Sequence, residues 1–425
     1  MPLLLRGGRV IDPSRNSDGI ADVLVVDGRI AAVGRNIGLP DGAQVHDATG
    51  KVVAPGLIDV HVHLREPGFE DIETIATGAA AAAAGGFSAV CAMPNTDPVI
   101  DNQASVGFVV AQARKAAKAR VYPIGCITIG QKGERLAEFG EMVGAGAVAV
   151  SDDGKPVASS HMMRTALEYA QIFGIPVADH CEDTSLAEGG AMHEGIVSIR
   201  LGLKGIPAAA EEIQVARDCI LAELTGGHVH LCHMSTRGSV ELIRRAKDKG
   251  LRVTAEAAPH HFTLTHDRVG GYDTNAKMNP PLREAADREA IRQAVKDGTI
   301  DVIATDHAPH HYDAKEREFD DAPNGILGLE TALGLAIREL VKPGLLTLPE
   351  LIHRMSTRPA QVFGLVGGTL AIGAPADVVV FDPELPWTVE AGRFSSKSRN
   401  TPFGGEELIG RALLTLVDGR IVFQR

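Results

Sequence analysis

The sequence predicts an α/β fold in which a (β/α)8 TIM-type barrel carries a small β-sandwich domain built from both chain termini. Two observations predict it. The middle of the chain alternates short apolar strands with alanine-rich helical stretches, as parallel βα units do. Both ends are rich in hairpin signals, and neither has enough strands to cover its own apolar face. We therefore expect residues 1–54 and 366–425 to form the small domain and residues 55–365 to form the barrel.

Length and composition limit the classes of protein that remain. A chain of 425 residues with 44% hydrophobic and 23% charged residues can bury a large core. No apolar run reaches the roughly 20 residues that a membrane span needs, and the first residues lack the pattern of a cleaved signal. The formal charge of −12 disfavours nucleic acid as a partner. We expect a cytoplasmic protein that binds neither membranes nor nucleic acid.

Hairpin signals define the two β-rich ends. The dipeptide Asp27-Gly28 separates two apolar runs, and Asp418-Gly419 does the same near the other end. Both ends contain the five residues Val-Asp-Gly-Arg-Ile. These repeated hairpins favour one small sheet domain assembled from both ends of the chain.

Eight strand candidates occupy the region between these ends. A closed barrel explains eight such units over about 300 residues better than an open sheet does. No phosphate-binding loop of the GxGxxG or GxxxxGK[ST] type follows any of them, which argues against the nucleotide-binding folds. The candidates are residues 57–62, 87–92, 120–127, 146–150, 175–180, 227–232, 251–256 and 300–304.

Metal-binding residue types recur where these strands end. In a barrel of this kind, catalytic residues lie at the carboxyl ends of the strands. The first strand ends in His61 and His63, whose alternate positions send both imidazoles to one face. Taken alone, a histidine here would more often be a core residue and an aspartate a turn residue. The remaining candidates are His180, His233, Asp306 and an aspartate of the segment 151–154 (SDDG).

Together these side chains predict a metal centre. Four histidines and two aspartates supply enough nitrogen and oxygen ligands for two divalent ions, and the imidazoles favour Zn²⁺. Two such ions would share one water and lower its pKa. The five cysteines are scattered without any CxxC pair, and we expect reduced core thiols. Arg65, on the same face as the histidines, could hold a substrate anion beside the metals.

The chain resembles the dihydroorotase family of the amidohydrolase superfamily, specifically its long bacterial class. The likeness spans nearly the whole chain and includes the order and spacing of the strand-end motifs. It implies reversible cyclisation of N-carbamoyl-L-aspartate to L-dihydroorotate in pyrimidine biosynthesis. The motifs are residues 59–68 (DVHVHLREPG), 93–96 (MPNT), 151–154 (SDDG), 179–182 (DHCE), 277–283 (KMNPPLR) and 304–310 (ATDHAPH).

The resemblance also assigns the metal ligands. It implies that His61 and His63 bind the first zinc and that His180 and His233 bind the second. Asp153 is implied as the bridge. Many relatives, including hydantoinases, dihydropyrimidinases and allantoinases, bridge with a carboxylated lysine instead, but residues 144–151 contain no lysine. Lys155 lies past the turn and is expected to be a solvated loop residue.

Proton transfer and substrate binding are assigned in the same way. The resemblance makes Asp306 a ligand of the first metal and the carrier of the proton between the attacking water and the amide nitrogen. It implies that Arg65, Asn95 and His310 bind the substrate carboxylate, and that Asn279 contacts the amide side of the ring. Without the resemblance, the two asparagines would equally be turn residues beside proline.

Two other functions fit part of this pattern. Another cyclic amidase would suit the metal site, although Arg65 and the missing bridge lysine argue against it. A noncatalytic scaffold partner of aspartate transcarbamoylase is the second alternative, but such proteins have lost metal ligands that this chain retains. Association as a homodimer and in a complex with aspartate transcarbamoylase both remain open.

Two further segments have weaker signals. His260 and His261 follow the seventh strand, and we expect them to support the site or the core without binding metal. The charged segment 312–325 follows the eighth strand. Such runs are usually solvated, but a long polar loop at a barrel mouth is also where a lid would lie.

Overall fold

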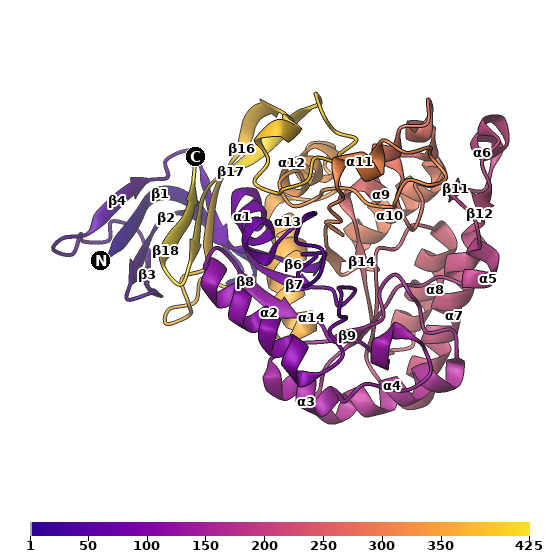
Figure 1. Cartoon of the computed structure of the whole chain (residues 1–425). Helices are drawn as coiled ribbons and strands as arrows, with labels where there is room; N and C mark the ends of the chain where they lie inside the picture. The colour runs from indigo at the N-terminus through magenta and orange to yellow at the C-terminus, as the bar shows by residue number, and fades with distance from the viewer. Residues whose placement is uncertain (1) are drawn as a thin grey trace.

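A closed barrel of parallel strands forms the larger part of the fold in the computed structural model, which describes residues 2–425 (Figure 1). Strands β6, β7 and β8 pair in parallel, as do β9, β10, β13, β14 and β15. Parallel bridges from Gly125 to Val150 and from Val62 to His307 join the two groups at both edges. The predicted eight-stranded barrel is therefore confirmed.

Each barrel strand overlaps its predicted range and most are shorter, but β9 shares only residue 150 with its range, and β9 and β14 each end one residue beyond the prediction. They are β6 (Leu57–Val62), β7 (Phe87–Ala92), β8 (Arg120–Pro123), β9 (Val150–Ser151), β10 (Val177–Asp179), β13 (Val229–Leu231), β14 (Val253–Ala257) and β15 (Val302–Ile303).

Helices cover the outside of the barrel, and segments inserted between strands extend its mouth (Figure 1). The covering helices are α1 (Ile75–Gly85), α2 (Gln103–Ala116), α3 (Phe139–Ala145), α4 (Ser160–Phe173), α7 (Ala208–Thr225), α8 (Arg237–Asp248), α10 (Ala285–Asp297), α12 (Ala332–Ala336), α13 (Leu348–Ile352) and α14 (Arg358–Phe363). The inserted elements are α5 (Thr184–Ala187), β11 (Met192–His193), α6 (Ile196–Leu201), β12 (Gly205–Ile206), α9 (Pro259–Thr263) and α11 (Tyr312–Lys315).

Local sequence explains why these helices form, and α4 is an example. The Ser159 side chain accepts a hydrogen bond from the backbone N–H of Met162 and so caps the first turn. Its buried residues recur at helical spacing, as Met163, Ala166, Leu167 and Ala170. The helix ends at Phe173 and is capped by Gly174, whose φ of 68° belongs to the left-handed region that favours glycine.

The two ends of the chain form one sheet beside the barrel (Figure 1). Antiparallel pairing of β5 with β16 joins the amino-terminal strands to the carboxy-terminal ones, in the order β18-β17-β16-β5-β1-β2-β3, with β4 paired to β1. The strands are β1 (Leu3–Asp12), β2 (Ser17–Val26), β3 (Arg29–Gly34), β4 (Gln44–Asp47), β5 (Val52–Pro55), β16 (Val378–Thr388), β17 (Glu407–Val417) and β18 (Arg420–Gln424).

Both predicted hairpins are present. Asp27 and Gly28 have φ values of 49° and 78°, and Asp418 and Gly419 have 49° and 71°. Positive φ at both central residues matches the right-handed twist of the flanking strands. The two turns also touch, because a Cβ placed on Gly28 would lie 2.9 Å from the carbonyl oxygen of Asp418. The repeated pentapeptide thus joins the two ends of the chain.

A bulge in β6 aims the first two histidines into the barrel. Ile58 and Val60 pack in the cluster inside the barrel, whereas Val62 and Leu64 pack between strands and helices. The pairing of β6 with β7 shifts register between Asp59 and Val62, as an extra residue in one strand requires. The even-numbered residues therefore change faces, and the odd-numbered histidines point inward.

Two expectations from composition concern the described residues. Within residues 2–425, no helix combines the length and the apolar character that a membrane span requires. All five cysteines are buried and unpaired, as predicted.

Candidate metal centre

The predicted metal and substrate residues converge on a pocket at the carboxyl ends of the barrel strands. The pocket has a volume of about 680 Å³. All predicted site residues line it except His61, which is fully buried. The predicted residues along its walls are His63, Arg65, Asn95, Asp153, His180, His233, Asn279, Asp306 and His310.

The first group of ligand atoms comes from the ends of β6, β9 and β15. His61 Nε2 lies 3.5 Å from Asp153 Oδ1 and 3.5 Å from Asp306 Oδ1. His63 Nε2 lies 3.5 Å from Asp153 Oδ2 and 3.1 Å from Asp306 Oδ1. Two imidazole nitrogens and two carboxylates thus surround one point.

The second group comes from the ends of β9, β10 and β13. His180 Nδ1 lies 3.0 Å from His233 Nε2. Asp153 Oδ1 lies 3.4 Å from the His180 nitrogen and 3.5 Å from the His233 nitrogen. Asp153 is therefore shared by both groups, as a bridging carboxylate would be.

These separations fit zinc. Ligand atoms that bind one tetrahedral zinc at about 2.0–2.1 Å lie about 3.3–3.4 Å from one another. The measured distances cluster around that value and are mostly longer than good hydrogen bonds. His61 Nε2 and Asp153 Oδ1 are buried without a hydrogen-bond partner. Because buried polar atoms are normally paired, these two atoms suit a metal ion.

Electrostatics keeps the carboxylates in the form that binds metal. Burial alone would raise the pKa of Asp153, but the charge of His61 and the nearby imidazoles of His180 and His233 bring that pKa well below its usual value. The pKa of Asp306 is likewise lowered, since His61 and His63 outweigh the effect of burial. Both side chains are therefore ionised at neutral pH.

Glu256, on β14, orients candidate ligand residues through hydrogen bonds. The sequence alone did not point to it. Its Oε1 lies 2.6 Å from His61 Nδ1, and its Oε2 lies 3.0 Å from His230 Nε2. The backbone N–H of His233 also donates to Oε1, at 3.2 Å. A carboxylate that accepts from the second nitrogen of a metal-binding histidine fixes the ring's tautomer and orientation. An acidic residue at the end of the seventh strand was the available signal.

Three predicted site residues have strained backbones. Arg65, His233 and Asp306 have φ values of 61°, 39° and 48°, in the left-handed region that few residues other than glycine adopt. Each costs about 1–3 kcal/mol. Such strain persists where the surrounding structure holds a side chain in place for function.

Arg65 and His310 lie together on one wall of the pocket. The Arg65 guanidinium is 3.4 Å from His310 Nε2, and its Nε donates to the carbonyl of Pro309 at 3.2 Å. Burial lowers the pKa of Arg65 to about 10, so it stays charged at neutral pH. Burial, and then the charge of Arg65, lower the pKa of His310 to about 2, so His310 stays neutral. Among the described residues of the wall, only Arg65 carries a permanent positive charge.

The two asparagines contact metal-centre histidines. Asn95 Oδ1 lies 2.9 Å from His63 Nδ1. Asn279 Nδ2 lies 3.4 Å from His180 Nε2 and donates to Glu182 Oε1 at 3.1 Å. Their amide groups are thus oriented at the edge of the pocket.

Other residues singled out in the sequence lie outside the ligand groups. Lys155 is exposed, and His260 and His261 are buried, with His261 Nε2 2.9 Å from the carbonyl oxygen of Pro280. The segment after β15 is only partly solvated. Lys315 is buried and donates to the backbone carbonyls of residues 274 and 323, so this lysine anchors the segment.

Sequence comparison gives relatives along the whole chain. A family model described as dihydro-orotase-like matches residues 50–239. The dihydroorotase of Pelobacter propionicus is 56% identical over 425 residues, and the match covers 100% of this chain and 100% of the relative. The dihydroorotase of Pelotomaculum thermopropionicum is 57% identical over 424 residues, with 100% of this chain and 99% of the relative covered.

Solved structures share the fold. The L-hydantoinase (dihydropyrimidinase) from Arthrobacter aurescens has a TM-score of 0.89 and 26% identity, over 99% of this chain and 96% of that protein. The dihydropyrimidinase from Brevibacillus agri, at 24% identity and a TM-score of 0.86 over 100% and 95% of the two chains, shows likeness of fold alone. Full-length identity above one half to dihydroorotases, together with this fold, shows that the chain belongs to the dihydroorotase family of the amidohydrolase superfamily.

Proposed function

We propose that this protein is a zinc-dependent dihydroorotase that interconverts N-carbamoyl-L-aspartate and L-dihydroorotate in pyrimidine biosynthesis. One observation carries the proposal. Two groups of ligand atoms share Asp153 at the base of a pocket whose permanent cation is Arg65. The full-length dihydroorotase relatives support the same reaction.

The residues present fit two zinc ions. His61, His63 and Asp306 would hold one ion, His180 and His233 the other, and Asp153 both. When bound, the zinc ions polarise the ring carbonyl and make water a stronger nucleophile at neutral pH.

Asp306 is the proposed proton carrier. In ring opening, the oxygen of water forms a bond to the carbonyl carbon and the carbon–nitrogen bond of the ring breaks. Asp306 takes a proton from that water and gives it to the departing amide nitrogen. Its position at the end of β15, with Oδ1 3.1 Å from His63 Nε2, keeps the carboxylate at the reacting centre. Ring closure follows the same steps in reverse.

Substrate recognition depends on the carboxylate of the ring. Arg65 would form charge-assisted hydrogen bonds with that carboxylate, and His310 and Asn95 would complete its binding. Asn279, on the opposite side near His180, would contact the amide side of the ring. The strained backbone of Arg65 and its contact with the Pro309 carbonyl fix the direction of the guanidinium.

Because the fold is like that of a hydantoinase, a neutral cyclic amide is the alternative substrate. Arg65 argues against it, because a partly buried guanidinium facing a neutral ring would lack a partner. A scaffold role is disfavoured because all six predicted ligands are present and converge.

A substrate panel tests the proposal. The zinc-loaded protein is assayed with dihydroorotate, hydantoin, dihydrouracil and allantoin under identical conditions. We expect kcat/KM for dihydroorotate to exceed that of each neutral ring by about 100-fold or more, since an unpaired buried charge costs several kcal/mol. Equal or greater activity on a neutral ring would assign the protein to another cyclic amidase class.

Organisation and assembly form part of the same proposal. We propose a small β domain made of residues 1–54 and 366–425 beside a catalytic barrel of residues 55–365. The pairing of β5 with β16 favours this division. The resemblance leaves a homodimer and a complex with aspartate transcarbamoylase to be tested. Sedimentation velocity of the protein, with and without aspartate transcarbamoylase, measures both.

A further inference from the structure

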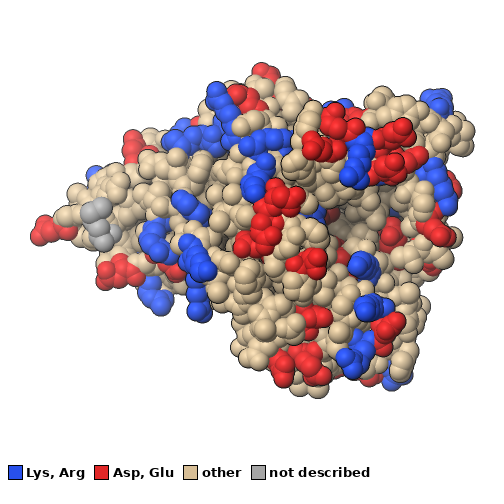
Figure 2. All heavy atoms as spheres, viewed as in Figure 1, with Lys and Arg blue, Asp and Glu red and all other residues tan. Residues whose placement is uncertain are grey.

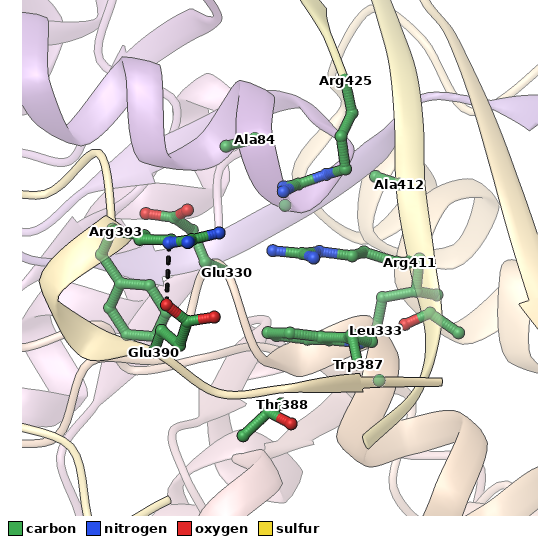
Figure 3. Close-up of a pocket in the computed structure, with 14 residues that line it drawn as sticks. Ala84, Glu330, Leu333, Trp387, Thr388, Glu390, Arg393, Arg411, Ala412 and Arg425 are labelled. Carbon is green, nitrogen blue, oxygen red and sulfur yellow. Dashed lines mark hydrogen bonds and ion pairs between the residues drawn. The ribbon is translucent and has the colours of Figure 1, made fainter. Parts of the chain in front are cut away.

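A second pocket lies where the barrel meets the extension formed by β16 and β17 (Figure 3). Its cavity volume is about 40 Å³, and it shares no lining residue with the pocket of the metal centre. The end of α1 and the start of α12 form one side, and the two long strands form the other. Nothing in the proposed reaction uses this pocket.

Three arginines face this pocket from different segments: Arg393, Arg411 and Arg425. The Arg411 guanidinium lies over the ring of Trp387, with Cζ 4.3 Å from the ring centroid. Arg425 lies on the other side of Arg411, so the two guanidiniums are neighbours (Figure 3). Arg393 projects from the rim and pairs with Glu390 at 2.7 Å.

The positive charge of this group is incompletely balanced. Within residues 2–425, neither Arg411 nor Arg425 makes an ion pair with a carboxylate, and Glu390 is engaged with Arg393. Burial, and then the charge of Arg425, lower the pKa of Arg411 to about 10. Two neighbouring guanidiniums that repel each other are stabilised by an anion placed between their donors.

Glu330 completes the pocket on the barrel side. Its carboxylate accepts a hydrogen bond from the Ser395 backbone N–H at 2.6 Å, and burial raises its pKa to about 7. At neutral pH this carboxyl group therefore carries a proton in much of the population. In that form it adds no negative charge to the pocket.

We propose that this pocket binds a phosphate group, either free phosphate or the phosphate of a small monoester, through Arg411 and Arg425 with Arg393 at the rim. A phosphate offers several acceptor oxygens in the geometry that planar guanidiniums match. Arg393 and Arg425 are exposed, so the organic part of a monoester would extend outward into solvent. This inference is independent of the substrate proposed for the metal centre.

Isothermal titration of the zinc-loaded full-length protein with inorganic phosphate, and separately with glycerol 3-phosphate, tests the proposal. We expect one phosphate site that Arg411→Gln and Arg425→Gln each weaken by about tenfold or more, since charge-assisted hydrogen bonds are lost. Arg420→Gln, on the exposed part of β18, is the matched control and should bind as the unaltered protein does. Glu330→Gln should retain binding, because the amide mimics the protonated acid. If glycerol 3-phosphate binds more tightly than inorganic phosphate, the natural ligand is a phosphate monoester. If the two bind equally tightly, the natural ligand is free phosphate.

The variants also distinguish this pocket from phosphate binding elsewhere in the protein. Phosphate held at the metal centre would bind equally to all four variants, and that result would overturn the proposal. Absence of binding to the unaltered protein would do the same. If the arginines only support the fold, Arg411→Gln lowers the melting temperature while phosphate affinity is unchanged. Arg425→Gln removes an exposed side chain, so it decides the question if Arg411→Gln does not fold.

Discussion

Glu256 Oε1 lies 2.6 Å from Nδ1 of His61, so the buried acid determines which nitrogen the histidine presents to the metal centre. Since Nδ1 donates its proton to the carboxylate, Nε2 is left with a lone pair toward Asp153 and Asp306. On the face shown in Figure 2, acidic and basic side chains are mixed over the surface.

Replacing Glu256 should weaken metal binding. Glu256→Gln keeps the size of the side chain but removes the charge that holds the His61 proton, so we expect zinc affinity to fall by about 10–100-fold. Competition with a chromophoric chelator measures this affinity. Glu241→Gln, exposed on α8, is the control. Unchanged affinity in the Glu256 variant would show that His61 is oriented without it.

Replacing Asp306 should stop proton transfer with little effect on folding. The amide of Asp306→Asn is nearly isosteric but cannot take a proton, so we expect kcat to fall by about 100-fold or more in both directions. Ring opening and ring closure are assayed separately, and zinc content is measured in the same sample. A variant with intact zinc and near-normal kcat would remove Asp306 from the proton pathway.

Arg65 should distinguish acidic rings from neutral ones. Arg65→Met leaves the substrate carboxylate without its partner, and we expect kcat/KM for dihydroorotate to fall by about 2–4 kcal/mol in free-energy terms. Zinc content should stay the same. Activity on dihydrouracil should not fall, because that ring has no carboxylate. Equal losses on both rings would indicate a structural role.

Asp301 should give the barrel a pH-dependent contribution to stability. It is buried and pairs with Lys247 and with Arg358, the latter at 2.7 Å. Burial alone would raise the pKa of Asp301, but these two cations bring that pKa below its usual value. A depressed folded-state pKa stabilises the fold above the unfolded pKa of about 4, and this contribution is lost as pH falls.

Denaturant unfolding of Asp301→Asn measures that contribution. We expect a loss of about 2 kcal/mol at pH 7, less than for a fully buried pair because both cations stay partly exposed. The difference from the unaltered protein should persist down to about pH 4 and shrink as the pH falls further, through the depressed pKa of the folded state. Asp41→Asn, in an exposed turn, should change little at either pH. A loss that is independent of pH would mean that the charge of Asp301 contributes nothing.

Much of the fold could be predicted because local signals agree with it. Strands β6 and β7 match their predicted ranges at both ends, since a glycine precedes each run and His63 or Pro94 follows closely after it. The Asp-Gly hairpins were predictable from turn chemistry. The insertion from α5 to β12 was not predicted, because its two-residue strands are too short to produce a periodic pattern.

The candidate ligands could be chosen from the sequence, but the contacts that support them could not. Histidines and aspartates at strand ends are visible in the sequence, whereas the bulge in β6 depends on pairing with β7. Glu256 was missed because its role depends on contacts with His61 and His230, which lie 195 and 26 residues away in the chain. The burial of Lys315 was not predicted, because this lysine belongs to a charged run and such runs are usually exposed to solvent.

The measurement that tests the account most directly is a zinc titration of metal-free protein, followed by dihydroorotate ring opening at each step. We predict that activity rises to a plateau at two zinc ions per chain, and that Asp153→Ala, which lacks the shared carboxylate, loses both zinc and activity. Lys155→Ala, in the same loop, should behave as the unaltered protein does. Full ring-opening activity without bound zinc, or an Asp153→Ala variant that keeps two zinc ions and normal turnover, would contradict the account.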